Sequence, residues 1–249
     1  NLLGLPVHYR DARTEGMADE VCKVIPREEL FGLTGIAFNQ FNTLFQLYAM
    51  KKAGDPALEM ADTMLFMPDL LAYFLTGKKG VEYTIASTSQ LLDPRTRNWS
   101  EEVFDRLGLP RKLMGKIERP GALRGTLLPD IAKECGVDEI PVYCVGGHDT
   151  ASAVAAVPAK GGDFAYLSSG TWSLLGVLSD EPKCDVAVLD AGYTNEGAVD
   201  GSIRLLKNIM GLWIIQECKR EWDRRADAVG FAELVEMARK APEFKAVID

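Results

Sequence analysis

Residues 143–158, YCVGGHDTASAVAAVP, hold the densest group of chemically capable side chains in the sequence. His148 is one of only two histidines and stands between Gly147 and Asp149. Glycines lack a Cβ, so a ligand or another backbone segment can approach them closely. A carboxylate beside an imidazole can accept a proton from a hydroxyl group while the imidazole orients that group. The stretch therefore predicts an acid–histidine site.

A structural role would explain the same residues. Asp149 precedes a run of small residues at 150–157 that suits a helix, so its carboxylate could simply cap the first turn. A single histidine such as His148 is also commonly a buried side chain with satisfied hydrogen bonds. The residue pattern leaves the catalytic and structural alternatives open.

A second candidate stretch is YLSSGTWSLLG at 166–176. Two strand-like runs, 164–168 and 172–178, flank a Ser-Ser-Gly-Thr turn in which Gly170 could adopt a positive φ. Backbone N–H groups and hydroxyls in such a turn can surround phosphate oxygens, although an ordinary hairpin turn has the same composition. The common phosphate-loop, dinucleotide and nucleophile-elbow motifs are absent from the sequence.

The surrounding elements must position these side chains. The apolar run 142–145 predicts a buried strand that ends beside His148 and Asp149, where open α/β sheets place their sites. A small-residue helix at 150–157 should follow, and the Pro- and Gly-containing stretch 158–163 predicts a linker. The other predicted elements are helices at 38–53, 68–76, 100–108, 207–222 and 231–241, a polar loop at 93–98 and a strand at 202–206.

Composition limits the classes of function. The 249 residues are 47% hydrophobic, which suits a soluble globular chain, and the net charge of −8 argues against a nucleic-acid partner. No apolar run approaches the roughly 20 residues needed to span a membrane. The five cysteines are odd in number and widely spaced, so we expect a reducing, cytoplasmic compartment. Neither histidine belongs to a cluster with metal-ligand spacing, and no metal-binding residue is assigned.

The motifs GGHDTASAVAAVP, YLSSGTWSLLG and LLKNIMGLWIIQE together strongly resemble the FGGY family of carbohydrate kinases. The segments LPVHYRDARTEGM, NQFNTLFQL, MPDLLAYFLTGK and EYTIASTSQLLD are similar to that family too. The resemblance covers nearly the whole chain in collinear order and is thinner in 101–135 and after Trp222. The joint presence of the three motifs favours the branch that acts on L-rhamnulose.

The resemblance implies an α/β chain with the actin/hexokinase-like (ribonuclease H-like) ATPase fold, in which two domains enclose a cleft. Residues 1–158 should be the later part of the N-terminal, sugar-binding domain. Residues 159–249 should be the opening part of the C-terminal, nucleotide-binding domain. The chain is therefore expected to be an internal fragment, without the opening strand–turn–strand or the later Gly-rich adenine-binding turn, and inactive on its own.

The resemblance also assigns roles. The expected reaction transfers the γ-phosphoryl group of MgATP to the 1-hydroxyl of L-rhamnulose, so ATP and Mg²⁺ are the implied cofactors. Asp149 matches the general base, and the sugar contacts match His148, Asp149, Thr150 and Asn208. The ATP contacts match Thr171 and Gln216.

Two features of the match leave questions. Asn208 and Gln216 lie eight residues apart, about two helical turns, and the alternative is that both are polar-face residues of the predicted helix at 207–222. Ala198 stands where the family more often has a glycine, so the backbone of that turn is expected to differ from the family pattern.

Three rival functions remain open from the sequence. A relative in the same family could phosphorylate another ketose or a polyol. A catalytically silent sugar- or nucleotide-binding regulator could use the same fold. A hydrolase could use His148 and Asp149, but no convincing nucleophile accompanies them.

Overall fold

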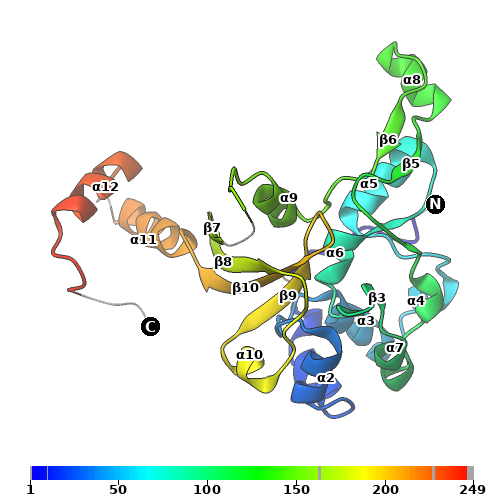
Figure 1. Cartoon of the computed structure of the whole chain (residues 1–249), viewed down its shortest axis with the longest axis horizontal. Helices are drawn as coiled ribbons and strands as arrows, with labels where there is room; N and C mark the ends of the chain where they lie inside the picture. Colours follow the sequence, from blue (N-terminus) through cyan, green and yellow to red (C-terminus); the bar gives the residue numbers. More distant parts are fainter. Residues whose placement is uncertain (1, 10, 162–163, 226–227, 246–249) are drawn as a thin grey trace. The chain divides into compact units, whose positions relative to one another are not determined.

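The computed structural model describes residues 2–9, 11–161, 164–225 and 228–245. The chain forms two compact units, of which the first comprises Asn1–Ser168 with Leu174–Asn208. The second comprises Ser169–Ser173 with Ile209–Asp249. Figure 1 labels the helices and strands of the chain in sequence order.

Helix ends in the first unit follow local capping signals. The Ser100 hydroxyl accepts the backbone N–H of Val103 at 3.4 Å and begins α7, while Gly108 ends it in the left-handed conformation. Gly77 ends α5 in the same way, and Pro68 lies in its first turn. The helices predicted at 68–76 and 100–108 are thereby confirmed. The helices of this unit are η1 (Ala12–Thr14), α1 (Met17–Cys22), α2 (Arg27–Thr34), α3 (Thr43–Lys52), α4 (Ala57–Met60), α5 (Met67–Thr76), α6 (Tyr83–Ser87), α7 (Glu101–Leu107), η2 (Arg111–Leu113), α8 (Pro129–Cys135), α9 (Asp149–Ala155) and α10 (Val186–Asp190).

The strands form one four-stranded sheet and several two-stranded ones among the described residues. The larger sheet has the order β7-β8-β10-β9, and its β9 and β10 are antiparallel. β1 and β4 form a parallel pair, whereas β2–β3 and β5–β6 are antiparallel pairs. The strands are β1 (Val81–Glu82), β2 (Leu92–Asp93), β3 (Asn98–Trp99), β4 (Ile117–Glu118), β5 (Leu123–Thr126), β6 (Pro141–Tyr143), β7 (Ala165–Ser169), β8 (Trp172–Ser179), β9 (Tyr193–Gly197) and β10 (Ile203–Met210).

Two apolar clusters hold the first unit together. The larger one joins helices α1, α2, α3 and α7 with the loops between them, and includes Phe45, Leu91 and Phe104. The smaller one contains Val154 of α9, Tyr166 of β7 and Leu206 of β10. Because these three residues pack together, α9 is fixed against one face of the four-stranded sheet (Figure 1).

Several predicted elements differ from the structure. The helix predicted at 38–53 begins only at Thr43, because the Asn42 side chain bonds Ala37 O and Gln90 instead of continuing a helix. The loop predicted at 93–98 is the turn of the short β2–β3 hairpin. Gly170 was expected to provide a positive φ, but it is not among the glycines with that conformation.

The strand predicted at 142–145 is present as β6, but it is not a buried strand of an open parallel sheet. It pairs antiparallel with β5 alone among the described residues, and Tyr143 and Val145 are exposed. Of the predicted linker 158–163, residues 162 and 163 lie outside the described part of the chain, and 158–161 carry no helix or strand.

The second unit contains α11 (Trp213–Arg224) and α12 (Phe231–Lys240). The prediction of a helix at 231–241 is confirmed by α12. None of the described residues of this unit is buried. Its helices thus lack the enclosed apolar core that stabilises the first unit.

The five cysteines are all free thiols. Cys144 is buried after β6, where its thiol donates to Glu118 Oε2 at 3.1 Å, and burial raises its pKa to about 11. Cys135, at the end of α8, is exposed. None of the described helices is long and apolar enough to cross a lipid bilayer.

Candidate functional site

The Gly146-Gly147 loop is held by a buried carboxylate on a distant element. Glu82, which precedes α6, accepts the N–H of Gly147 at 2.9 Å and the hydroxyl of Thr84 at 2.6 Å. Thr84 Oγ1 in turn accepts the N–H of His148 at 3.1 Å. A Cβ added at Gly147 would lie 3.1 Å from Glu82 Oε2, so the absence of a side chain there permits this close contact.

His148 is the N-cap residue of α9 and lies mostly inside the protein, with 19% of its side chain exposed. Its Nδ1 lies 2.8 Å from Arg204 Nη2 and 3.4 Å from Glu196 Oε2. Its Nε2 lies 3.8 Å from Asp149 Oδ1. Burial lowers the pKa of His148, and the positive charge of Arg204 lowers it further against the opposing carboxylates.

Glu196 and Arg204 are directly opposed residues of β9 and β10. Arg204 Nη2 donates to Glu196 Oε2 at 2.8 Å, and Nε donates to the carbonyl of Gly197 at 3.1 Å. Arg204 is 0% exposed. A buried guanidinium requires such a partner, because an isolated charge there would lose its hydration without compensation. The Arg204–Glu196 ion pair therefore has a fixed position beside the Nδ1 atom of His148.

Asp149 has the opposite environment, with 98% of its side chain exposed. Its Oδ1 accepts the N–H of Thr150 at 2.7 Å and the Thr150 hydroxyl at 3.3 Å. The N-cap of α9 is His148, and Asp149 is the first helical residue. Asp149 therefore does not occupy the N-cap position that the capping alternative assigned to it. Its carboxylate is open to a ligand beside the imidazole.

Asn208 lies on a strand and not on a helix as expected. β10 continues to Met210, and α11 begins only at Trp213, so Asn208 and Gln216 do not share a helix. The predicted helix at 207–222 was wrong at its start because the apolar spacing of 207–212 suits either element. Residues an even number apart on a strand point to the same face, so Asn208 shares the face from which Arg204 reaches His148.

Thr171 and Gln216 both belong to the second unit. Thr171 is exposed in the turn between β7 and β8, and its carbonyl accepts the N–H of Trp213 at 3.3 Å. The carbonyl of Gly170 accepts the N–H of Leu212 at 2.9 Å. These bonds join the turn to the start of α11, whose first turn carries Gln216. The two predicted nucleotide contacts therefore lie on connected segments.

The structure thus brings His148, Asp149 and Thr150 together at the start of α9. Sequence reasoning did not find the residues that hold them: Glu82, Glu196 and Arg204. Glu196 and Arg204 leave one detectable signal, since opposite charges flanking the turn at 198–202 suit a cross-strand pair. Ala198, which departs from the family pattern, has no positive φ and fits this turn with its N–H donating to Ser202 O at 2.9 Å.

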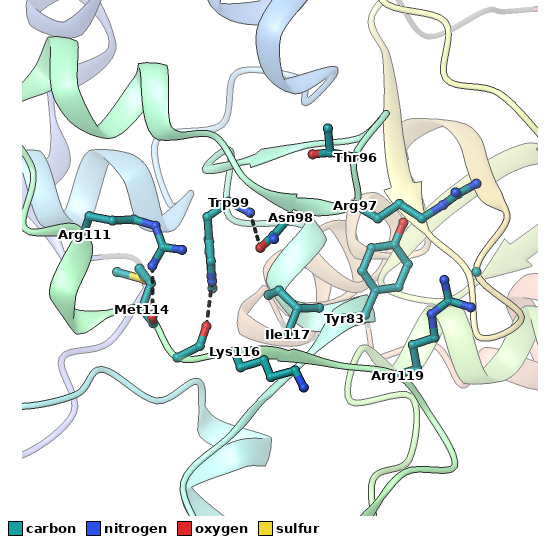
Figure 2. Close-up of a pocket in the computed structure, with 12 residues that line it drawn as sticks. Tyr83, Thr96, Arg97, Asn98, Trp99, Arg111, Met114, Lys116, Ile117 and Arg119 are labelled. Atoms are coloured by element: carbon teal, nitrogen blue, oxygen red, sulfur yellow. Dashed lines mark hydrogen bonds between the residues drawn. The ribbon is translucent and has the colours of Figure 1, made fainter.

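A separate cavity of about 440 Å³ lies in the first unit (Figure 2). Its lining includes four cationic side chains and no acidic one, although Arg111 is already paired with Glu101 at 2.8 Å. None of the predicted site residues lines it, so it does not take part in the predicted acid–histidine chemistry. The lining residues are Tyr83, Thr96, Arg97, Asn98, Trp99, Arg111, Met114, Gly115, Lys116, Ile117, Arg119 and Gly201.

Curated relatives resemble the chain over its whole length. A rhamnulokinase of Bacteroides thetaiotaomicron is 45% identical over 100% of this chain and 50% of its own length. One from Pectobacterium carotovorum is 42% identical over 99% of this chain and 48% of its own. The chain therefore spans about half the length of the curated relatives it matches.

Solved structures share the fold. A ligand-bound xylulose kinase from Lactobacillus acidophilus has a TM-score of 0.79 at 20% identity, over 97% of this chain and 48% of that one. A glycerol kinase from Plasmodium falciparum with ADP has a TM-score of 0.77 at 16% identity, over 96% of this chain and 48% of that one. The expected α/β, actin/hexokinase-like fold is confirmed.

The family models match in two consecutive segments. Residues 1–156 match the N-terminal domain of the FGGY family of carbohydrate kinases, and residues 165–249 match its C-terminal domain. With the relatives above, these matches show that the chain belongs to the FGGY family of carbohydrate kinases.

Proposed function

We propose that the protein carrying this chain is an ATP-dependent kinase that phosphorylates the 1-hydroxyl of L-rhamnulose. The observation that carries the proposal is the pairing of an exposed carboxylate, Asp149, with a fixed imidazole, His148, whose Nε2 lies 3.8 Å from it. The family membership supports the reaction class, and relatives named rhamnulokinase at 39% to 45% identity support the sugar.

Asp149 acts as the general base in this proposal. A sugar hydroxyl is a poor nucleophile until it begins to lose its proton, and a carboxylate within hydrogen-bonding distance can accept that proton. Thr150 holds one carboxylate oxygen through two hydrogen bonds, so the group has a defined orientation despite its exposure. As the proton moves to Asp149, the hydroxyl oxygen forms its bond to phosphorus and the bond between the γ-phosphorus and its bridging oxygen breaks.

The remaining residues bind and orient the substrates. His148, Thr150 and Asn208 are the proposed sugar contacts, and the first two lie beside Asp149 at the start of α9. Thr171 and Gln216 are the proposed nucleotide contacts, of which Thr171 is exposed and Gln216 is half-buried. When bound, ATP would supply the phosphoryl group and Mg²⁺ would neutralise part of its charge.

Mg²⁺ prefers oxygen ligands such as carboxylates, water and phosphate. No group of three or more His, Cys, Asp or Glu side chains is placed among them so as to hold a metal ion. The proposal assigns no residue of this chain as a magnesium ligand, and the ion would rely largely on water and phosphate oxygens.

The proposal also includes a domain division and a cellular location. In it, residues 1–158 form the later part of the sugar-binding domain, and residues 159–249 form the opening part of the nucleotide-binding domain. The family matches to residues 1–156 and 165–249 support this division. The five free thiols support a reducing, cytoplasmic compartment.

The test is ADP release by the full-length protein, measured with MgATP and a panel of sugars. L-rhamnulose is expected to give the highest kcat/KM, and D-xylulose, L-ribulose and glycerol to be disfavoured by about tenfold or more, because they leave polar groups of the site unpaired. Equal kcat/KM for glycerol and L-rhamnulose would reject the assigned sugar. ATP and sugar binding without ADP release would instead indicate a silent regulator.

A further inference from the structure

The two ring nitrogens of His148 face different chemical environments. Nδ1 faces the buried pair of Arg204 and Glu196, whereas Nε2 faces the exposed Asp149 carboxylate. The position of the ring proton therefore decides what the imidazole offers to a bound sugar. A proton on Nε2 makes that atom a donor, and a proton on Nδ1 makes Nε2 an acceptor.

Arg204 determines where this proton can reside. A guanidinium group has only donors and stays protonated in proteins. Its Nη2 lies 2.8 Å from His148 Nδ1, so Nδ1 must accept and cannot itself carry hydrogen. Otherwise two N–H groups would oppose each other at this distance. Nη2 carries two hydrogens, and the second is donated to Glu196 Oε2 at 2.8 Å.

The charged groups around the ring favour its neutral form. Burial is the largest influence and lowers the pKa of His148, and the Arg204 charge acts in the same direction. Glu196, Asp149 and Glu82 act in the opposite direction and raise it, with a smaller overall effect. A neutral imidazole with Nδ1 as acceptor carries its one proton on Nε2.

We propose that Arg204 is a positioning residue, which holds neutral His148 in the tautomer with hydrogen on Nε2 so that the imidazole donates to a sugar hydroxyl beside Asp149. The proposal rests on the kinase function above for the identity of the acceptor. Glu196 serves by fixing the guanidinium from the neighbouring strand, since Arg204 and Glu196 are register partners. Asn208 follows on the same face of β10, which places a further polar side chain on this side of the sheet.

The direct test is the tautomer itself, read from ¹⁵N NMR of the imidazole nitrogens in the 249-residue chain near neutral pH. The sequence contains only two histidines, so a His8→Gln variant assigns the signals of His148. The expected spectrum has a protonated, pyrrole-type Nε2 and an unprotonated, pyridine-type Nδ1. A pyrrole-type Nδ1 in the unaltered chain would overturn the proposal without any need for a variant.

Variants at Arg204 identify the cause. Arg204→Met removes every donor and leaves Glu196 Oε2 at 3.4 Å from Nδ1, so the proton should move to Nδ1 or the ring should become cationic. Arg204→Lys keeps a donor and should retain protonated Nε2. An unchanged tautomer in folded Arg204→Met would overturn the role of Arg204.

Kinetics of the full-length protein test the consequence for the sugar. In Arg204→Met the KM for L-rhamnulose should rise by about tenfold or more, with a smaller change in kcat and none in the KM for ATP. Arg124→Met is the control for the loss of a buried arginine, because only 2% of the Arg124 side chain is exposed and its partners are Asp69, Glu118 and the carbonyl of Gly80.

The kinetic outcomes distinguish a positioning role of Arg204 from a nonspecific structural effect of removing a buried arginine. An equal rise in sugar KM for folded Arg124→Met would overturn the positioning role. The tautomer measurement needs no substrate, so it tests the role of Arg204 independently of the kinase function. If the unaltered full-length protein released no ADP with any ketose, only the kinase function would be rejected.

Discussion

Asp149 and His148 are adjacent in sequence, but their side chains differ in solvent exposure and in how firmly they are held. The carboxylate of Asp149 is almost wholly exposed and accepts hydrogen bonds from Thr150, whereas the imidazole of His148 is fixed by Arg204 on the other side. A general base must be accessible to its substrate, while the group that orients the substrate must be rigid. The two environments therefore suit the two proposed roles.

Replacement of Asp149 by Asn should abolish most of the activity and preserve the fold. Asn has nearly the same shape, and its side-chain oxygen can still accept the N–H of Thr150, so α9 should form unchanged. Loss of a general base lowers the rate by about 10²–10⁴-fold. ADP release by full-length protein measures the effect, with the KM for ATP as control. A variant that keeps more than about half of its kcat would show that Asp149 is not the base.

The depressed pKa of His148 should make the protein less stable in mild acid. Burial lowers the folded-state pKa below the ordinary value of 6.5, so the unfolded chain binds more protons as the pH falls through 6.5. The free energy of unfolding should therefore decrease from pH 7.5 towards pH 5.5, mainly below the unfolded-state pKa of about 6.5. Urea unfolding at several pH values measures it.

A His148→Gln variant is the control for this pH dependence. It removes the titrating ring, so the decrease between pH 7.5 and 5.5 should be smaller than in the unaltered chain. An identical pH dependence in both proteins would show that His148 does not titrate differently on folding.

Among the secondary-structure elements, the β9–β10 pair sets the geometry beside His148. Gly197 ends β9 next to Glu196, and its carbonyl accepts from Arg204. A Cβ added there would lie 2.5 Å from the ring of Tyr83, which belongs to α6. The absence of a side chain at Gly197 thus lets α6 pack directly on this strand.

Gly197→Ala should destabilise the chain by about 1–3 kcal/mol, because the ring of Tyr83 or the strand must shift to accommodate the methyl group. Gly32→Ala is a matched control, since Gly32 lies inside α2 and has no atom within 4 Å of the added Cβ. That change should stabilise by about 0.5–1 kcal/mol. Thermal unfolding of both variants provides the measurement. A stabilised Gly197→Ala chain would contradict the packing.

Elements with local signals could be predicted from the sequence. Ser100 with Gly108, and Pro68 with Gly77, fixed two helices because caps act within one turn of the chain. The start of α11 could not be predicted, because the residues before it continue β10, which lies between β8 and β9 in the sheet and pairs Lys207 with Tyr193 of β9. The sheet bonds formed by Lys207 and its neighbours outweighed the helical spacing.

Of the candidate site, the sequence could predict the residues within one local motif but not the distant residues that contact them. Asp149, His148 and Thr150 share one motif and were found together, because a helix start places consecutive residues side by side. Glu82 and Arg204 approach this motif from 65 and 56 residues away. A single sequence contains no periodicity that reveals such contacts, since they depend on tertiary packing.

At the scale of the whole molecule, the two units differ in their cores. The first unit encloses many fully buried side chains, including Phe31, Phe45 and Phe104. In the second unit none of the described residues is buried. A segment without buried apolar contacts has little local stability against opening.

Amides of α11 and α12 should therefore exchange with solvent much faster than those of α3 and α7 in the 249-residue chain. The buried residues Leu44 and Phe104 anchor the latter helices, so their exchange should require near-global unfolding. Hydrogen exchange followed by mass spectrometry measures both regions in one sample. Comparable protection of α11 and α7 would contradict the expected difference.

The buried thiol of Cys144 has a practical consequence for site-specific labelling. Its pKa of about 11 leaves almost no reactive thiolate at pH 8, and its position after β6 shields it from reagents. Cys135 is exposed at the end of α8, so a maleimide dye should attach there well before it reaches Cys144. A reporter on Cys135 would lie on the segment leading to the Gly146-Gly147 loop and would leave the Cys144–Glu118 contact intact.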